Sequence, residues 1–240
     1  MKGLLIVLPL LMQPALSGPA GGGRVEGDDL GSLDKWKKAG TWFEAGEAGL
    51  DPANDKLLAA KEGKGVLVNG KDGKTANLFT TAEYGDVEAH VEFTISKGSN
   101  SGVYFCGRYE IQVLDSFGKA EAHYSDCGGI YQRWDPKRGK GKEGYEGHAP
   151  KVNASKAPGE WQSFDVVFRA PRVGADGKKT ANAKFVKVVH NGQLIHENVE
   201  VTGTTRAGAW EDEKPAGPIM LQGDHGPVAF RNFRVKKLAE

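Results

Sequence analysis

Apolar and polar residues alternate along most of this chain with a period of two. Residues 86–95 (DVEAHVEFTI) show the pattern clearly, because apolar side chains occupy every second position and mostly charged ones occupy the others. A period of two places the apolar side chains on one face of an extended strand, so the pattern predicts a half-buried β-strand. The same alternation predicts strands over residues 164–168, 183–189 and 228–238. A helical period is nearly absent, and only residues 51–60 are compatible with a short helix.

Turn signals join these strands. Asn191-Gly192 stands between two β-prone segments, and Asn-Gly is the strongest short hairpin signal, so residues 184–190 and 193–199 are expected to pair antiparallel. Residues 136–159 are polar, glycine-rich and too long for a simple turn. They form either a lid or a solvated excursion, and the second interpretation is favoured. Short strands with glycine-rich turns predict an all-β fold, a jelly-roll sandwich of two antiparallel sheets in which one curved sheet forms a groove.

The first residues have the pattern of a secretory signal peptide. Lys2 gives a positive start, residues 3–12 (GLLIVLPLLM) are apolar, and a small-residue Ala-Leu-Ser sequence follows. This apolar stretch is too short to cross a bilayer as a helix, which needs about 20 residues, so an uncleaved anchor is the less favoured alternative. We expect a signal peptide over residues 1–17, a flexible leader over 18–27 and one exported domain over 28–240, in the periplasm or outside the cell.

Composition supports the all-β interpretation and narrows the choice of partner. The 240 residues include 34 glycines and only 11 prolines, which favours tight turns over a proline-rich linker. Lys and Arg total 32 and Asp and Glu total 31, so the formal charge is +1. This balance attracts neither nucleic acid nor an anionic membrane. We expect neither partner for the mature protein, and we expect function to depend on a local site.

The chain has two cysteines, Cys106 and Cys127. In an oxidising compartment a disulfide between them would close a loop of about 20 residues and stabilise the fold by about 3 kcal/mol. Two buried, inert thiols beside predicted strands are an equally favoured alternative. A cysteine nucleophile is least favoured, because the sequence places no histidine or cation beside either thiol.

The stretch with the most chemical information is residues 100–118 (NSGVYFCGRYEIQVLDSFG). On a strand through its middle, Glu110 and Gln112 face the same way. A β-bulge near Leu114 would turn Asp115 onto that face and complete a polar row lining the groove. Carboxylates in such a row can bind sugar hydroxyls, ligate a cation or transfer protons. From spacing alone, a solvated Glu110 and a strand-ending Asp115 are the favoured alternative.

A second polar group lies near the C-terminus, in residues 217–226 (GPIMLQGDHG). Gln222 and His225 stand at a predicted strand end among glycines, where a ligand can approach the backbone closely. A neutral imidazole there could act as a base or a metal ligand, although a lone histidine is more often a surface residue. His123, in the connection after the carboxylate strand, is a weaker candidate.

Five sequence blocks occur in order along the chain: NSGVYF…YEIQVLDSFG, CGGIY, PGEWQSFDV, GPIMLQGDHG and VAFRNFRVKKL. Together they resemble the 3-keto-disaccharide hydrolase family, also described as 3-keto-glucoside 1,2-lyase/3-keto-2-hydroxy-glucal hydratase domains and formerly a domain of unknown function. The resemblance covers about residues 28–240 and implies a concanavalin-like jelly roll related to glucanases and lectins. One position departs from the family pattern. Members often carry arginine after the Tyr-Phe pair, where this chain has Cys106, and Arg108 is the nearby arginine that could replace it.

The resemblance implies an elimination followed by a hydration. A keto group at C3 acidifies the hydrogen at C2, so a base removes it and the glycosidic oxygen leaves C1; water then adds to the 2-hydroxy-glucal. The enzyme needs a base, stabilisation of an enediolate and a proton for the leaving group. The matching motifs assign catalysis to Glu110, Asp115 and His225. The same three side chains would hold a divalent metal ion that acts as a Lewis acid, and no nucleotide cofactor is expected.

Contacts to the substrate, a 3-keto sugar or another carbohydrate, involve a wider set of side chains. The candidates are Arg108, Gln112, His123, Tyr131, Trp161 and Gln222. Tyr131 and Trp161 would form a stacking surface for the sugar ring, with a core position for Trp161 as an equal alternative. Two other functions stay open. A retaining glycoside hydrolase needs Glu110 and Asp115 about 5 Å apart, whereas a non-catalytic carbohydrate-binding module needs aromatic residues but no converging carboxylates.

Overall fold

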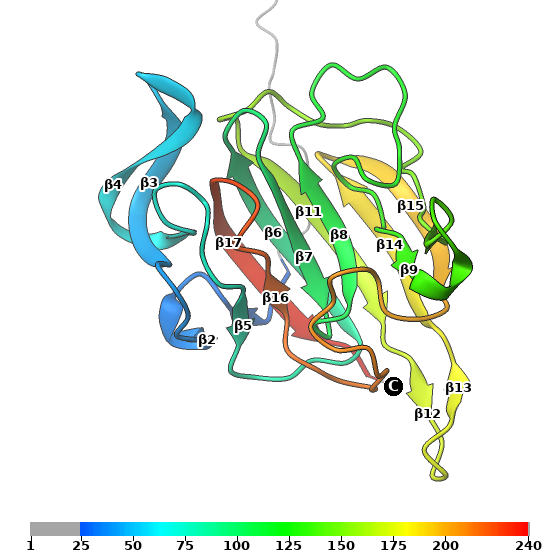
Figure 1. Ribbon diagram of the computed structural model, residues 1–240. Coiled ribbons are helices and arrows are strands. Elements are labelled where there is room, and N and C mark those ends of the chain that lie inside the picture. The colour runs from blue at the N-terminus through cyan, green and yellow to red at the C-terminus, as the bar shows by residue number, and fades with distance from the viewer. Residues whose placement is uncertain (1–24, 240) are drawn as a thin grey trace, which may run out of the picture.

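The computed structural model describes residues 25–239, and these form two antiparallel β-sheets that pack as layers (Figure 1). The larger sheet consists, in spatial order, of β15 (Gln193–Val201), β14 (Ala183–His190), β11 (Gln162–Arg169), β6 (Val87–Ile95), β17 (Val228–Lys237), β4 (Asn54–Val68) and β3 (Phe43–Asp51), with β1 (Asp28–Asp29) beside β17. The smaller sheet consists of β2 (Trp36–Lys37), β5 (Leu78–Thr80), β16 (Met220–Leu221), β7 (Asn100–Phe105) and β8 (Tyr109–Leu114). The predicted all-β jelly-roll fold class is confirmed.

Short elements lie outside these two sheets. They are the pair β9 (Arg133–Trp134) and β10 (Gly144–Tyr145), the pair β12 (Arg172–Val173) and β13 (Lys179–Ala181), and the 3-10 helices η1 (Leu33–Lys35) and η2 (Pro136–Arg138).

The predicted alternation places one face of each strand in the core. In β6 the apolar positions are all buried: Val87, Ala89, Val91, Phe93 and Ile95. They share one hydrophobic cluster with side chains of the smaller sheet: Val103, Phe105, Ile111 and Val113. The other strands predicted from alternation correspond to β11, β14 and β17. Because the core takes the inner faces, the polar positions of both sheets lie on their outer faces.

The predicted Asn-Gly hairpin is confirmed. β14 and β15 pair antiparallel, with His190 opposite Gln193. Asn191 and Gly192 have φ values of 50° and 81°, in the left-handed region that a two-residue type I′ turn requires.

The short helix predicted over residues 51–60 is wrong. These residues form the turn between β3 and β4 and the first half of β4, with Asp51 opposite Asn54. Asp51 Oδ1 accepts a hydrogen bond from Ala53 N at 2.8 Å. Such an Asx turn reverses the chain, and the local turn chemistry outweighs the weak helical spacing.

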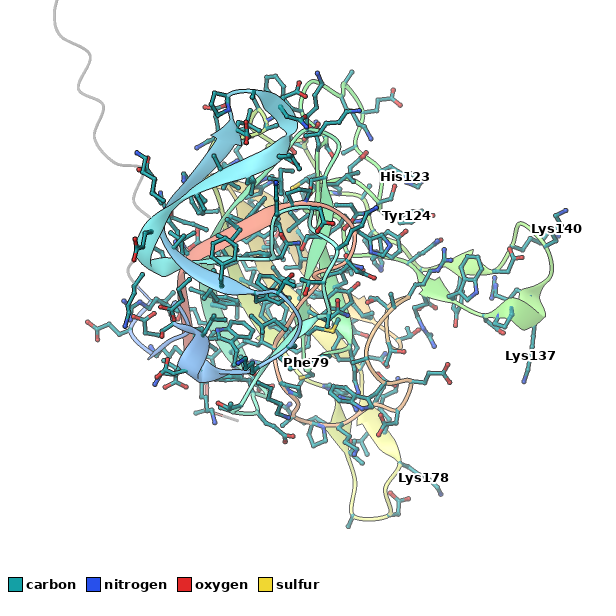
Figure 2. All side chains as sticks on the ribbon, turned by 60° about the vertical axis from the view of Figure 1, so that its left-hand side comes forward. Phe79, His123, Tyr124, Lys137, Lys140 and Lys178 are labelled. Carbon is teal, nitrogen blue, oxygen red and sulfur yellow. The ribbon has the colours of Figure 1, made fainter. Side chains whose placement is uncertain are left out.

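Residues 136–159 fit a solvated excursion better than a lid. The segment starts with η2, and β10 then pairs back onto β9. Figure 2 shows Lys137 and Lys140 on a projection that points away from the two sheets. The chain returns to the body where His148 N donates a hydrogen bond to Ile130 O at 2.9 Å.

The two cysteines are free, buried thiols, so the considered disulfide is not formed. Cys106 lies in the turn between β7 and β8, with its Sγ 3.3 Å from Tyr84 O. Cys127 lies beside the far end of β8, where Gly128 N donates to Gln112 O. About 17 Å of strand separates these ends, whereas a disulfide allows about 7 Å between Cα atoms. Burial raises the pKa of both thiols to about 12, so neither is an activated nucleophile.

Within residues 25–239, no helix is long and apolar enough to cross a membrane. The predicted signal peptide and most of the predicted leader lie outside the described residues.

Candidate active site

The outer face of the smaller sheet carries a row of side chains that crosses its strands. Strand pairing places Phe79 opposite Met220 and Met220 opposite Tyr104. Tyr104 in turn lies opposite Glu110. The next segment extends the row, because Tyr131 N donates to Glu110 O at 3.3 Å. Paired residues share one face of a sheet, so Glu110 lies in a row that runs from Phe79 to Tyr131.

A second, polar row lies beside the first. Gly102 is opposite Gln112, and Gln222 N donates to Gly102 O at 3.0 Å. Gly102 has no side chain, and a Cβ atom there would lie 2.4 Å from Glu110 Oε1 and 2.8 Å from Tyr104 Cε2. The bare backbone at Gly102 therefore leaves the space that the Glu110 carboxyl occupies.

Glu110 is an unusual carboxyl because it is only 3% exposed and no cation among the described residues 25–239 lies beside it. Burial raises its pKa to about 8, and a hydrogen bond from the Tyr104 hydroxyl opposes this rise. Burial is the main reason that the pKa of Tyr104 lies well above its usual value. The negative charge of Glu110 adds to this rise, and that of Asp224 adds less. At neutral pH most Glu110 side chains are therefore protonated and able to donate a proton.

Three amide oxygens on this face are buried and find no hydrogen-bond partner in the part of the chain that the structure describes. They are Gln112 Oε1, Gln222 Oε1 and Asn100 Oδ1. An unpaired buried acceptor costs about 1–3 kcal/mol, and sugar hydroxyls are donors that could pair with these oxygens. Sequence reasoning missed Asn100, although a period of two from Gly102 along β7 places it on the same face.

His225 lies next to this polar row. Its Nδ1 lies 2.5 Å from Asp224 Oδ1 and 3.3 Å from Gln222 Nε2, and its carbonyl accepts from Asn100 N. A carboxylate that accepts from Nδ1–H leaves Nε2 free to act as a base. Sequence reasoning also missed Asp224, and its position directly before His225 was the available signal.

Asp115 does not join the row. β7 and β8 pair without a register shift, so the predicted bulge near Leu114 is absent. Asp115 Oδ2 instead accepts from Gly98 N at 2.9 Å. Five residues of extended chain separate its Cα from that of Glu110 by about 16 Å, which does not fit the pair of carboxylates that a retaining glycoside hydrolase needs.

The proposed metal ligands are not assembled either. Among residues 25–239, no three His, Cys, Asp or Glu side chains are close enough to hold a metal ion. Glu110, Asp115 and His225 therefore do not fit a shared divalent cation.

The Arg108 guanidinium forms its hydrogen bonds with other groups of the protein and is not aimed at a ligand. It is 3% exposed, and its guanidinium donates to Cys106 O at 2.8 Å and to Asp212 Oδ1 at 2.7 Å. The same group lies 4.8 Å from the Trp210 ring centroid. Arg108 thus positions the loop that carries Trp210.

His123 and Tyr131 belong to an aromatic group beside Glu110. The His123 and Tyr124 ring centroids are 3.9 Å apart, and those of Tyr124 and Tyr131 are 5.8 Å apart. Figure 2 shows His123 and Tyr124 together, apart from Phe79. Of these residues, Tyr131 lies directly beside Glu110 in the row.

Trp161 does not form a stacking surface with Tyr131. It packs against the second hydrophobic cluster, with Arg231 over its ring at 3.9 Å. It also lines a pocket of about 890 Å³ on the outer face of the larger sheet, together with His90 and Asp165. Trp161 is partly buried, so it packs at the edge of this cluster rather than inside the core.

The chain matches the model of one protein family, the 3-keto-alpha-glucoside-1,2-lyase-like domain, over residues 26–236. It belongs to this family. The match includes all but the last residue of the two sheets and every residue of the Glu110 row, and it confirms the resemblance inferred from the motifs. The family places the chain among carbohydrate-active enzymes.

One solved structure supports the fold. A protein of Parabacteroides distasonis ATCC 8503, provisionally described as a glycosyl hydrolase, is 24% identical with a TM-score of 0.60, covering 98% of this chain and 94% of that one. A second protein of that organism with the same description is 22% identical with a TM-score of 0.48, covering 82% and 100%. Comparison with curated proteins gave no match.

Proposed function

We propose that this protein is an exported enzyme that cleaves 3-keto-glycosides by elimination and then hydrates the product. The observation that carries the proposal is that the buried Glu110 carboxyl and the His225 imidazole both border the polar row of Gly102, Gln112 and Gln222. Glu110 has a pKa of about 8, and His225 is oriented by Asp224. Family membership supports the substrate class, and the pattern of residues 1–17 supports export.

In the elimination, His225 Nε2 removes the proton from C2, which the neighbouring C3 carbonyl acidifies. The electron pair of the C2–H bond forms the C1–C2 double bond, and the bond from C1 to the glycosidic oxygen breaks. Glu110 gives its proton to that oxygen, which leaves as an alcohol. The products are a 3-keto-2-hydroxy-glucal and a free alcohol, with Glu110 ionised and His225 protonated.

The hydration uses the same two groups in reverse. The Glu110 carboxylate takes a proton from water as its oxygen adds to C1, and the His225 imidazolium returns a proton to C2. Both groups regain their starting protonation states. A pKa near 8 suits Glu110 for both roles, because a group with a pKa near the working pH can donate and accept with similar ease.

The unpaired amides provide a reason for sugar binding at this place. Gln112, Gln222 and Asn100 surround the bare backbone of Gly102, and their oxygens need donors. Ring hydroxyls supply such donors in fixed geometry, so binding removes the cost of leaving the oxygens unpaired.

A substrate comparison in D₂O tests the proposal. The purified protein is incubated with a 3-keto disaccharide and, separately, with the unoxidised parent, each with and without a chelator. We expect cleavage of the keto sugar alone, transient 2-hydroxy-glucal, and deuterium at C2 of the product by NMR. The chelator arm tests whether a divalent ion takes part. Cleavage of the parent but not the keto sugar, or product without deuterium at C2, would overturn the proposal.

A further inference from the structure

We propose that Phe79 and Trp210 form the subsite for the leaving group, and that this group presents a flat apolar face, as a second sugar ring does. The inference rests on the proposed function, because it assigns one end of the same site.

The site has a direction along β7 and β8. Glu110 lies near the turn that joins the two strands, and Gln112 and Gln222 lie one level further from it. Asn100, whose backbone nitrogen bonds His225 O, lies at the far level. The acid is therefore nearer the turn, and the base approaches from the opposite side.

Trp210 lies on the turn side of this arrangement. Ala209 N donates to Gly107 O in the turn at 2.8 Å. A Cβ atom on Gly107 would lie 2.6 Å from Trp210 Cζ3, so the ring rests directly on the turn. Since the base acts on the keto ring and the acid acts on the oxygen beyond it, the leaving group extends from Glu110 toward Trp210.

Trp210 is exposed but fixed in place. It is 42% exposed, and its ring centroid is 5.8 Å from that of Phe79. Arg108 lies against the ring, and Asp212 and the Cys106 carbonyl hold Arg108. A ring that is already immobilised loses little entropy when a ligand stacks on it, so it is suited to binding an apolar face.

The distance across the sheet makes this subsite selective for larger leaving groups. Phe79 is three strands from Glu110 in the same row, which corresponds to about 14 Å. A small leaving group at Glu110 does not reach Phe79, whereas a ring beyond the glycosidic oxygen extends toward it.

The test compares three substrates that differ only in the leaving group: methyl 3-keto-glucoside, 4-nitrophenyl 3-keto-glucoside and a 3-keto disaccharide. We expect Trp210→Ala and Phe79→Ala to lower kcat/KM about tenfold for the two substrates with a ring in the leaving group and to leave the methyl glycoside nearly unchanged. A larger loss with the disaccharide assigns the subsite to sugars, and a larger loss with the nitrophenyl glycoside assigns it to aryl groups. Phe79→Leu keeps an apolar side chain without a flat ring and covers the case of a misfolded alanine variant.

Phe43→Ala is the matched control, because Phe43 is 40% exposed but lies on β3 of the larger sheet. It should change none of the three rates. An equal loss with all three substrates, or no loss with any, would overturn the subsite. If the wild-type protein turns over no keto sugar, the proposed function fails separately. Binding of the unoxidised disaccharide, measured by calorimetry with wild type and Trp210→Ala, still decides the subsite, and equal affinities would overturn it.

Discussion

The two outer faces of the sandwich both carry polar side chains, but they differ in how their ionisable side chains are paired. On the larger sheet, His90 bonds Asp165 at 2.7 Å and Arg231 bonds Glu92 at 2.7 Å, all at half-buried positions. On the smaller sheet, within residues 25–239, the nearly buried Glu110 carboxyl has only a tyrosine hydroxyl as partner, and the nearby amide oxygens have none.

This difference separates a structural polar face from a functional one. Paired charges near the surface contribute little in either direction, whereas unpaired buried groups lower stability. Carboxyl groups with shifted pKa values and acceptors without a donor are typical of sites where a ligand supplies the missing hydrogen bonds. The size of a pocket is a poorer indicator of the functional site. The pocket of about 890 Å³ lies on the outer face of the larger sheet, where the charged side chains are already paired.

The largest expected effect is on catalysis by the smaller sheet. Glu110→Gln keeps the shape of the side chain but removes the transferable proton, so we expect kcat for a 3-keto disaccharide to fall by about 100-fold or more. Asp115→Asn is the matched control, because Asp115 is on the same stretch of chain but bonds Gly98. Its rate should stay near that of the wild type. Equal losses in the two variants would contradict the separation of Glu110 from Asp115.

The second effect is on the pH dependence of stability. The pKa of Glu110 is about 8 in the fold, against 4.5 as the ordinary value. Between these pH values the folded state holds a proton that the unfolded state has lost. The contribution of Glu110 to the free energy of unfolding is therefore greatest below pH 4.5. It falls by about 4 kcal/mol as the pH rises to 8. Urea unfolding at pH 5 and pH 8 should show most of this fall in the wild type relative to Glu110→Gln, and parallel pH profiles would contradict it.

The sequence predicted the strands well but the site only in part. Alternation and the Asn-Gly turn reflect local backbone preferences, so the sequence alone was enough to predict β6, β14 and β15. Glu110 and Gln112 followed from the same alternation. The separation of Asp115 from Glu110 did not, because the presence of a bulge depends on the pairing of β7 with β8. Burial of Glu110 depends on packing between distant segments, which no local pattern contains.

The third prediction concerns the close approach of the Glu110 carboxyl to the backbone of Gly102. A Cβ atom there would lie 2.4 Å from Glu110 Oε1, so Gly102→Ala should displace the carboxyl and cost about 1–3 kcal/mol of stability. Gly49→Ala on β3 is the control, since nothing lies within 4 Å of its Cβ position. It should leave stability and turnover nearly unchanged. Urea unfolding and turnover of the keto sugar measure both variants, and an active, fully stable Gly102→Ala protein would show that the carboxyl does not need this space.

The smallest effect is expected on the larger sheet. The hydrogen bond that His90 Nδ1–H donates to the Asp165 carboxylate raises the pKa of His90, although partial burial opposes the rise. The stabilisation from the charged pair is therefore complete below the ordinary pKa of 6.5 and is lost as pH rises through the higher folded value. Asp165→Asn should cost about 1 kcal/mol or less at pH 5.5, and the difference from the wild type should shrink by pH 8.5. Turnover should not change, because this pair lies on the sheet opposite Glu110. A loss of turnover in Asp165→Asn at full stability would mean that the larger sheet also takes part in catalysis, and the contrast between the two faces would then be wrong.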